Sequence, residues 1–518
     1  MKKFTVLFVL FACVHLNAQV LIKDVYPGIQ SGVMSSQNIV FDNKLYYHGV
    51  DTDFSPGSIF VSDGTDAGTR KLLGTENITN FGHFTNTGTK LFFDGFLGVR
   101  TLFVSNGKDL GTKGVRGFET TPIEAIMKID TNKVLLFVQA DPLKPNPNQL
   151  WVSDATVNGT LKIADINATT KNTYKSSNFK GGAVFFDNST NTTKMAPMIS
   201  DGTSAGTLTI QSYLSKNGLF NFDNVYTAYG VDSLLFVGGI KNSVKLTIVT
   251  DGTSAGTKEI SLSKESSNYL DVFFINTSFI IHNDKDISSY DYTRNEAVFL
   301  TTDAAPYGAF KVHKDRLYFY AAESNGDTYI CVTDGTKKGT LKVDNSAFGV
   351  TTDANIQVLG NRIYFVIETI PLLKEIWRFH QDTLKAESYT DFGGRFRPVI
   401  FNTIPNQIIL SRYTNVLGSE LYKVDNNSTA SRDFQIPDKI SAFPVPANRE
   451  IFIDLSKLNW IPDYLEVYNL SGQLYKKVKY GSPSVQPIKL DVQELPQGNY
   501  LLKLFDKQKV STLSFTKK

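Results

Sequence analysis

One eight-residue segment, repeated along most of the chain, constrains the fold more than any other feature of this sequence. It spans residues 62–69 and reads SDGTDAGT, and related copies begin at Ser105, Ser153, Ser200, Thr250 and Thr333. The second residue of each copy lies at position 63, 106, 154, 201, 251 or 334, so successive gaps are 43, 48, 47, 50 and 83 residues. The last gap is about twice the others, and it predicts a degenerate copy near residue 291, where residues 289–293 read SYDYT. A period of this size indicates repeated supersecondary units.

Two further degenerate copies bring the total to nine units. One runs from Glu375-Ile376-Trp377 to Asp382, and the other runs from Glu420-Leu421-Tyr422 to Asp425. Each unit also has an apolar or aromatic run ahead of its turn. These runs are Leu45-Tyr46-Tyr47, Leu91-Phe92-Phe93, Leu135-Leu136-Phe137, Val184-Phe185-Phe186, Leu234-Leu235-Phe236, Phe279-Ile280-Ile281, Leu317-Tyr318-Phe319, Ile363-Tyr364-Phe365 and Ile408-Ile409-Leu410. Short runs of this kind, bounded by Gly, Asn or Asp, are typical of buried strands.

Each unit accommodates four short strands, with the Asp-Gly turn between the third and the fourth. Four strands per 40 to 50 residues is typical of a β-propeller blade. We therefore predict an all-β fold, with a β-propeller of about eight to nine four-stranded blades over residues 19–435. In the turn, Gly64 tolerates positive φ and Asp63 bonds nearby amides. We expect the second glycine, Gly68, to re-enter the sheet through a β-bulge.

Composition agrees with a β-rich fold and argues against some partners. The chain of 518 residues has 37 Phe, 23 Tyr and 38 Gly, which favours strands joined by tight turns. Lys and Arg number 53 against 50 Asp and Glu, a net charge of +3, which argues against a dedicated nucleic-acid binder.

The N-terminus predicts export. Lys2 and Lys3, an apolar run over residues 4–13 and a small residue at Ala18 fit a signal peptide spanning residues 1–18. The alternative is a lipoprotein signal whose Cys13 would be lipidated. No other stretch reaches the roughly 18 continuous apolar residues of a membrane-spanning helix. After signal removal Cys331 is the only cysteine, so we predict no disulfide and interpret it as a small buried residue.

The repeat resembles a known family of exported bacterial proteins whose unit reads roughly Glu-Leu-Trp-x-Ser-Asp-Gly-Thr-x-x-Gly-Thr. The nearest matches are residues 150–154, LWVSD, and residues 59–65, IFVSDGT. This ELWxSDGT resemblance covers about 400 residues, and it implies architecture and export more than chemistry. Residues 20–25 are similar to the strand that normally follows Gly-Thr. We expect them to close the ring by pairing with a blade from the other end.

The repeat stops after Asp425, and residues 436–518 have a different pattern. Four strand-like runs, at residues 451–453, 465–468, 500–504 and 512–515, predict a small Ig-like antiparallel β-sandwich. This segment resembles the C-terminal sorting domain of type IX secretion substrates of Bacteroidetes. The resemblance rests on residues 443–447, FPVPA, residues 467–474, VYNLSGQL, residues 495–500, LPQGNY, and the final FTKK. Val445 departs from the Asn usual between the two prolines.

The sorting-domain resemblance implies where the protein goes and what it meets. Its motif residues here are Pro444, Pro446, Gly472, Gly498, Lys517 and Lys518. It implies recognition by the type IX machinery, passage across the outer membrane, and either release or anchoring at the cell surface. An exposed strand edge and the basic end of the chain would suit docking by strand addition.

The search for catalytic and metal-binding residues yields few candidates. The six His residues, at positions 15, 48, 83, 282, 313 and 380, show no zinc-ligand spacing, and nucleotide and acyl-transfer motifs are absent. The repeated carboxylates could hold Ca²⁺, and the candidates are Asp63, Asp154, Asp201, Asp251 and Asp334. We favour a structural turn over a metal site, and we predict no cofactor. Trp151, Trp377, Tyr46 and Tyr47 could stack on sugars, although core packing is our preferred interpretation.

Three functions remain open at this point. The first is a non-enzymatic exported propeller that binds a glycan or a protein at or beyond the cell surface. The second is a secreted carbohydrate-active enzyme with carboxylates around the propeller channel. The third is a structural matrix component without a specific ligand. Residues in which the blades differ would have to distinguish them.

Overall fold

The computed structural model describes most of the chain. The described residues are 20–28, 30–52, 55–119, 122–139, 148–166, 177–188, 195–262, 269–283, 286–300, 305–343, 355–370, 373–391, 401–414, 417–425, 441–443, 447–454, 462–469, 473–479, 488–505 and 510–518. The expected signal peptide lies outside them. The chain divides into two compact units, residues 1–428 and 429–518. The predicted boundary at residue 435 also falls outside the described residues.

The first unit contains nine four-stranded sheets within the described ranges, which we call blades 1 to 9. Blade 1 holds β2 (Val33–Phe41), β3 (Lys44–Gly49), β4 (Ser58–Ser62) and β5 (Arg70–Lys71); blade 2 holds β6 (Thr79–Asn86), β7 (Leu91–Leu97), β8 (Val99–Ser105) and β9 (Thr112–Phe118); blade 3 holds β10 (Ile123–Lys128), β11 (Val134–Val138), β12 (Asn148–Ser153) and β13 (Leu161–Ile166). Blade 4 holds β14 (Ser177–Phe179), β15 (Gly182–Asn188), β16 (Met195–Ser200) and β17 (Leu208–Thr209); blade 5 holds β18 (Asn224–Val231), β19 (Leu234–Lys241), β20 (Val244–Thr250) and β21 (Lys258–Ile260); blade 6 holds β22 (Tyr269–Ile275), β23 (Ser278–Asn283), β24 (Ile287–Asp291) and β25 (Glu296–Leu300).

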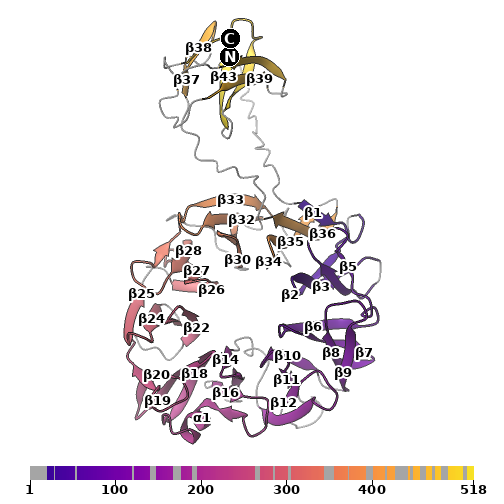
Figure 1. Ribbon diagram of the computed structural model, residues 1–518, viewed down its shortest axis with the longest axis vertical. Helices are drawn as coiled ribbons and strands as arrows, with labels where there is room; N and C mark the ends of the chain where they lie inside the picture. The colour runs from indigo at the N-terminus through magenta and orange to yellow at the C-terminus, as the bar shows by residue number, and fades with distance from the viewer. Residues whose placement is uncertain are drawn as a thin grey trace, which may run out of the picture. The chain divides into compact units, whose positions relative to one another are not determined.

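The last three blades complete the ring. Blade 7 holds β26 (Ala305–His313), β27 (Arg316–Ala322), β28 (Thr328–Thr333) and β29 (Leu341–Lys342); blade 8 holds β30 (Ile356–Leu359), β31 (Arg362–Ile370), β32 (Leu373–His380) and β33 (Ala386–Asp391); blade 9 holds β34 (Phe401–Ile404), β35 (Gln407–Thr414), β36 (Gly418–Asp425) and β1 (Val20–Lys23). The blades stand around a centre with the first strand of each innermost (Figure 1). The short helix α1 (Ile210–Lys216) lies between blades 4 and 5 in the sequence.

The first two strands of a blade form a hairpin because the turn residues accept positive φ. In blade 1, Asp42 and Asn43 have φ of 47° and 59°, the geometry of a two-residue hairpin turn. In blades 5 and 7 the same place is taken by Asp232 and Lys314, with φ of 47° and 53°. The first hairpin turn and the Asp-Gly turn of a blade therefore lie on the same face of the ring.

Each blade is covered on both sides by its neighbours. Nine clusters of buried apolar side chains fill the first unit, and each one combines residues of two successive blades. The cluster between blades 9 and 1 contains Ile22, Leu45 and Ile409. Nine clusters between nine blades make the ring continuous, so the all-β propeller prediction is confirmed with nine blades. Cys331 is fully buried, as expected.

The expected ring closure is also confirmed. β1 pairs antiparallel with β36, with Val20 opposite Lys423 and Leu21 opposite Tyr422. Blade 9 therefore takes three strands from the C-terminal end of the unit and its fourth from the N-terminal end.

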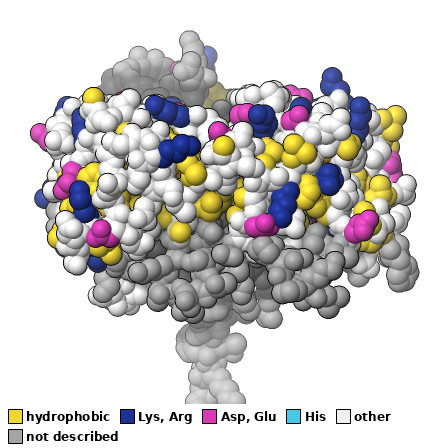
Figure 2. Space-filling view, turned by 90° about the horizontal axis from the view of Figure 1, so that it is seen from below, with side chains coloured by type: hydrophobic (Ala, Val, Ile, Leu, Met, Phe, Trp, Pro, Cys, Tyr) yellow, Lys and Arg dark blue, Asp and Glu magenta, His cyan; other side chains and the backbone are white. Residues whose placement is uncertain are grey.

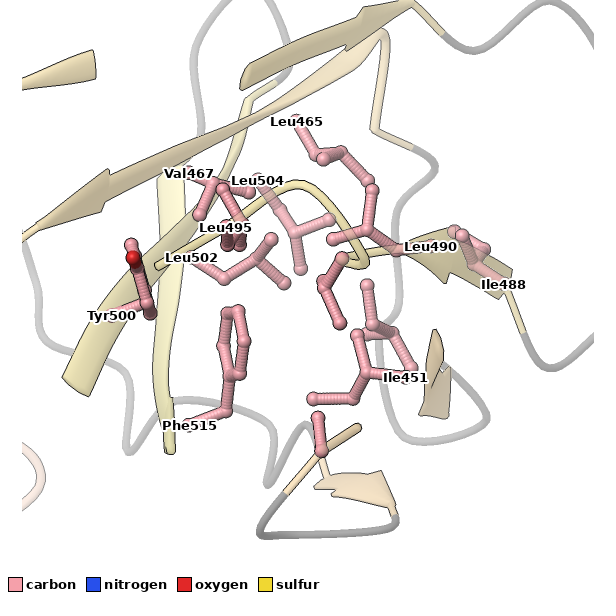
Figure 3. Close-up of a cluster of buried hydrophobic side chains, with 13 residues drawn as sticks. Ile451, Leu465, Val467, Ile488, Leu490, Leu495, Tyr500, Leu502, Leu504 and Phe515 are labelled. Carbon is pink, nitrogen blue, oxygen red and sulfur yellow. The ribbon is translucent and has the colours of Figure 1, made fainter. Parts of the chain in front are cut away.

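The second unit is a small β-sandwich. One sheet has β37 (Ser441–Phe443), β38 (Glu450–Asp454) and β41 (Ile488–Asp491), and the other has β40 (Leu474–Lys479), β39 (Tyr464–Asn469), β42 (Gly498–Phe505) and β43 (Val510–Lys517). Its core includes Ile451, Leu465, Leu490 and Phe515, which point toward one another between the strands (Figure 3).

A pair of alanine substitutions in β1 tests the closure. Ile22 is 6% exposed and packs between blades 9 and 1, whereas Leu21 on the same strand is 36% exposed. We expect Ile22→Ala to lower the free energy of unfolding by about 2–5 kcal/mol, and Leu21→Ala by less than about 1 kcal/mol. Urea unfolding of the two variants measures the difference. Equal effects would show that β1 does not bury Ile22 in the ring.

Candidate functional site

The repeated turn is held by its own side chains. In the first copy, the Asp63 carboxylate accepts hydrogen bonds from the Thr65 amide at 2.9 Å and the Thr65 hydroxyl at 2.7 Å. The Thr65 hydroxyl oxygen accepts from the Gly68 amide at 3.0 Å. The hydroxyls of Ser62 and Thr69 bond each other at 2.7 Å across the base of the turn. Asp, Thr, Gly and the two hydroxyl residues therefore each have a geometric role.

The same network recurs in the other complete copies. The carboxylates of Asp154, Asp201, Asp251 and Asp334 each accept from the amide and the hydroxyl of the threonine two residues later, at 2.7–2.9 Å. These hydroxyl bonds hold the pKa of Asp63, Asp154 and Asp251 below its usual value. The degenerate copy in blade 6 keeps the bonds from Thr293 to Asp291.

The two glycines of the turn have different roles. Gly64 has φ of 84°, and the equivalent place in blade 3 is taken by Ala155 at φ of 75°. Gly68 lies against the Asp63 carboxylate, where a Cβ would overlap the carboxylate oxygens. The expected β-bulge at Gly68 is wrong, because this residue belongs to the turn and the pairing of β4 with β5 is regular from Val61 opposite Arg70.

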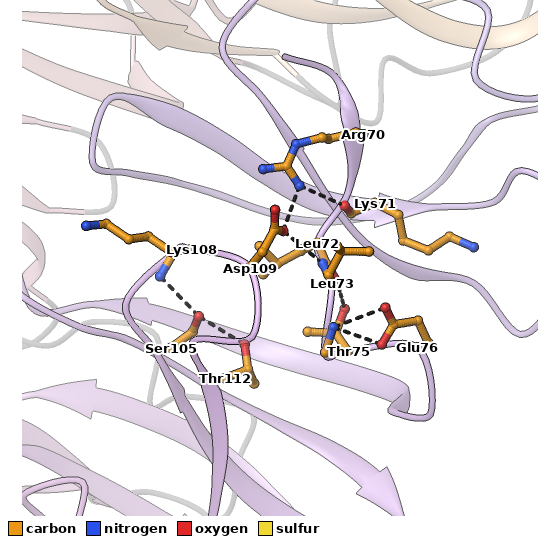
Figure 4. Close-up of polar contacts among 12 residues, drawn as sticks. Arg70, Lys71, Leu72, Leu73, Thr75, Glu76, Ser105, Lys108, Asp109 and Thr112 are labelled. Carbon is orange, nitrogen blue, oxygen red and sulfur yellow. Dashed lines mark hydrogen bonds and ion pairs between the residues drawn. The ribbon is translucent and has the colours of Figure 1, made fainter. Parts of the chain in front are cut away.

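The turns also connect neighbouring blades. The Gln407 amide of blade 9 donates to the Asp63 carbonyl of blade 1 at 2.9 Å. Two other copies of the turn also accept from the preceding blade: the Gly107 carbonyl accepts from the Tyr46 hydroxyl at 2.9 Å, and the Asp154 carbonyl accepts from Lys90 at 3.1 Å. Between the first two copies, Arg70 also forms an ion pair with Asp109 at 2.7 Å (Figure 4). The recurring segment is therefore an inter-blade connector.

The five calcium candidates are not brought together. Asp63, Asp154, Asp201, Asp251 and Asp334 lie in blades 1, 3, 4, 5 and 7. Within the described ranges, no group of three or more His, Cys, Asp or Glu side chains is placed to hold a metal ion. Calcium binding at a single turn remains an untested hypothesis.

A cavity lies where the inner strands of blades 3 to 7 reach the face with the hairpin turns. Its volume is about 410 Å³, within the range of small-ligand pockets. Its walls include Tyr229, Phe273 and Phe274, which are all partly exposed, and Val312, which is 40% exposed. The polar lining comes from Lys128, Ser177, Asn178 and Asp232. Sequence reasoning missed these residues because they come from five blades and share no motif.

Two Asp–His pairs are further polar features of the inner strands. Asp94 is 1% exposed, and its carboxylate contacts His83 Nδ1 at 2.8 Å and Arg100 at 3.1 Å. In blade 6, Asp271 lies 3.4 Å from Nδ1 of the buried His282. Both pairs are eleven residues apart and join the first two strands of a blade, a spacing that an alternating-strand pattern could have revealed.

The aromatic candidates have different environments. Tyr46 and Tyr47 are at most 1% exposed and pack between blades, so their core role is confirmed. Trp151 is partly exposed, and its indole donates to Gln149 at 2.9 Å under the Arg116 guanidinium. Trp377 donates in the same way to Glu375 at 2.9 Å.

On the rim drawn in Figure 2, Lys, Arg, Asp and Glu side chains are interspersed with apolar ones.

In the second unit, Gly498 begins β42, whereas Pro444, Pro446 and Gly472 lie outside the described residues. Lys517 is 8% exposed, and its backbone forms a β-bridge with Ala447. The Lys518 amide donates to the Ala447 carbonyl at 2.9 Å, and Lys518 itself is exposed. The last strand is therefore partly covered on its outer edge.

Replacement of Gly68 tests why the turn needs its second glycine. We expect Gly68→Ala to destabilise the protein by about 1–3 kcal/mol, because the new Cβ displaces the hydrogen-bonded Asp63 carboxylate. Gly114→Ala is the matched control, since its Cβ would meet only ordinary contacts, the nearest 3.5 Å away at Thr101. Thermal unfolding of both variants measures the effect. If the two variants melt alike, the carboxylate does not explain the glycine.

The lowered pKa values predict how the turns respond to acid. A carboxyl group whose folded pKa is depressed stabilises the fold above its unfolded pKa, about 3.9, and loses that contribution as the pH falls through the folded pKa. We expect Thr65→Val, which removes the hydroxyl donor to Asp63, to move the midpoint of acid unfolding to higher pH. Thr89→Val is the control, because its hydroxyl bonds a carbonyl. Circular dichroism between pH 2 and 6 measures both midpoints, and an unchanged midpoint in Thr65→Val would contradict the assignment.

Comparison with known proteins identifies the second unit. Residues 441–518 match the family model described as a secretion system C-terminal sorting domain. No curated protein matches the chain. Among the described residues, no helix is long and apolar enough to cross a membrane.

Solved structures resemble the chain at low identity. PorZ, a bacterial surface component of the type IX secretion system of Porphyromonas gingivalis, is 10% identical with a TM-score of 0.26, over 95% of this chain and 82% of that one. A prolyl endopeptidase is 12% identical with a TM-score of 0.36, over 64% of this chain and 54% of that one. Prolyl oligopeptidase B from Galerina marginata is 11% identical with a TM-score of 0.35, over 65% and 56%. The chain thus spans about half the length of these peptidases.

The sorting-domain match sets the destination of the protein. Such a domain engages the type IX machinery and directs its carrier across the outer membrane to the cell surface or the medium. The chain is a nine-bladed propeller that ends in a type IX secretion C-terminal sorting domain.

Proposed function

We propose that the protein is an exported glycan-binding protein whose propeller takes its ligand in the cavity formed by blades 3 to 7. The observation that carries this proposal is the set of three partly exposed aromatic rings, Tyr229, Phe273 and Phe274, in one cavity with four polar side chains. Ligand sites of this size combine apolar and aromatic walls with a few polar groups that fix orientation.

The aromatic rings are held in fixed positions from behind. Phe273 packs against Phe310 with 4.8 Å between ring centroids, and Phe274 packs edge-on against Phe279 at 4.9 Å. Neither ring has to be ordered when a ligand arrives, so little conformational entropy is lost on binding. A rigid aromatic surface suits the apolar C–H face of a sugar ring.

The polar groups around these rings suit hydroxyl groups. Lys128 donates, Asp232 accepts, and Asn178 can do both. Burial raises the pKa of Tyr229, so its hydroxyl stays protonated at neutral pH and remains a donor. A mixed set of donors and acceptors without a dominant charge favours a hydroxyl-rich ligand over a strongly acidic one.

A secreted carbohydrate-active enzyme is the second candidate, and the Asp94–His83 pair favours it. The Asp94 carboxylate accepts a hydrogen bond from Nδ1–H of His83, so that Nε2 of this 35%-exposed ring is the nitrogen that could take up a proton. A histidine oriented by a buried carboxylate can act as a general base. In this alternative the propeller would turn over the polysaccharide that it binds.

A glycan array probed with the full mature chain tests the proposal. We expect Phe274→Ala to weaken binding to the selected glycan about tenfold or more, because truncating a well-packed aromatic anchor costs about 2 kcal/mol. Phe96→Ala is the matched control, since Phe96 is a 44%-exposed aromatic in blade 2, away from the cavity.

The outcomes separate the candidates. Equal binding by the two variants, or binding to no glycan, would contradict the proposed site. Release of reducing ends from a polysaccharide, abolished by His83→Gln, would favour the enzyme. Capture of a protein without any glycan signal would favour a protein ligand.

A further inference from the structure

Glu420 holds the junction where the ring closes. It lies in β36 and is fully buried. Its carboxylate accepts the Val25 amide at 3.0 Å and the Gly32 amide at 2.7 Å, which belong to the chain between β1 and β2. Gly32 approaches so closely that a Cβ there would overlap the carboxylate. Close by, the Ser419 amide donates to the Ser31 hydroxyl at 3.1 Å. One carboxyl group therefore connects the last strand of the propeller to its first segment.

The corresponding residues of blades 3 and 8 accept a hydrogen bond within their own blade. In blade 8, Glu375 accepts from the Trp377 indole at 2.9 Å, and in blade 3 Gln149 accepts from the Trp151 indole at 2.9 Å. Blade 9 has Tyr422 in the place of the tryptophan, and this residue has no indole N–H to offer. The Glu420 carboxyl group is thereby available for the closing segment.

The surroundings of Glu420 contain several titratable or charged groups. Asp24 follows β1, Tyr47 lies on β3, and Tyr422 lies on the strand of Glu420 itself. Arg412 stands opposite Glu420 in the register of β35 and β36, with its guanidinium 5.5 Å from the Tyr422 ring centre. Within the described ranges no cation forms an ion pair with Glu420. The buried Asp24 Oδ1 and Tyr47 hydroxyl also have no hydrogen-bond partner there.

A carboxyl group in this position is costly to ionise. Burial removes it from water, and the nearby Asp24 adds a like charge, while the backbone amides partly offset both effects. Together these effects raise the pKa of Glu420 from 4.5 to about 7. A group whose folded pKa is raised stabilises the closed form fully below its unfolded pKa of about 4.5 and loses that contribution as the pH rises to about 7.

We propose that Glu420 is a proton-sensitive clasp, which keeps the propeller ring closed while its carboxyl group is protonated and lets the junction open more readily once it ionises. The open form exposes Glu420 and frees β1 from β36. The bonds of Glu420 join β36 to the chain between β1 and β2, so we expect the response to be confined to blades 9 and 1.

Amide hydrogen exchange of the full mature chain measures this opening directly. Linkage between a pKa of 4.5 in the open form and about 7 in the closed form predicts that the opening equilibrium rises on the order of 70-fold from pH 5 to pH 8. The probes are the amides of Val25 and Gly32, after correction for the intrinsic exchange rate at each pH. Amides of β19 and β20 in blade 5 serve as internal controls and should keep their protection.

Two variants assign the effect to Glu420. We expect Glu420→Gln, which cannot ionise, to flatten the pH dependence to within about threefold. Glu375→Gln is the matched control, because Glu375 has the same place in blade 8, and it should keep the wild-type profile. An infrared difference spectrum between pH 5 and pH 8 should show a buried protonated carboxyl band in the wild type that Glu420→Gln lacks.

A flat wild-type exchange profile would overturn the proposal, whatever the variants do. The same holds if Glu420→Gln keeps the wild-type pH dependence or leaves the infrared band in place. If Glu420→Gln opens the junction at every pH, the variant is uninformative. The pH dependence of exchange in the wild type and its infrared carboxyl band then decide whether the proposal holds. Neither readout depends on a glycan, so this proposal can fail or succeed independently of the proposed function.

Discussion

The two apolar faces of every blade impose the main constraint on this molecule. A sheet of four short strands can bury both faces only if another blade stands on each side. The first unit meets this requirement with nine clusters for nine blades, including the one in which Ile22, Leu45 and Ile409 meet. A ring without its junction would expose the apolar surfaces of blades 9 and 1 to water. The pairing of β1 with β36 is thus the contact on which the remaining interfaces depend.

The repeated turn also helps to hold neighbouring blades together, at the outer edge of the ring. Its Asp and Thr form a rigid loop without help from the rest of the blade, and its first glycine lets the loop approach the neighbouring blade closely. A Cβ at Gly107 would overlap the Tyr46 hydroxyl, and one at Gly64 would overlap the Gln407 amide. These contacts account for the recurrence of the segment by its fit to the neighbouring blade. Blade 6 lost the Gly-Thr ending but kept the Asp291–Thr293 bonds, so the loop is the part that the fold requires.

Much of this architecture was predictable because it is periodic. The spacing of the turns predicted nine units, and the similarity of residues 20–25 to a fourth strand predicted the closure. The role of Gly68 was not predictable, since its contact with Asp63 depends on side-chain geometry within the turn. The β-bridge between Ala447 and Lys517 was not predictable either, because it joins two segments that are 70 residues apart in the sequence. The cavity residues could not be found because Lys128, Tyr229 and Phe273 are distant in sequence and follow no shared pattern.

The outer turns repeat from blade to blade, whereas the residues of the proposed ligand cavity do not, and this difference has a physical cause. The outer turns must fit the preceding blade, and this fit favours one short sequence pattern. The inner strands lie nearest the centre of the ring (Figure 1), and residues near the ends of five of them line the cavity. Side chains there can differ from blade to blade without breaking the ring, as Lys128, Asn178 and Tyr229 do. Glu420 illustrates the same freedom at the junction. The corresponding Glu375 of blade 8 accepts from the Trp377 indole of its own blade, whereas Glu420, with tyrosine two residues later, bonds the first segment of the propeller.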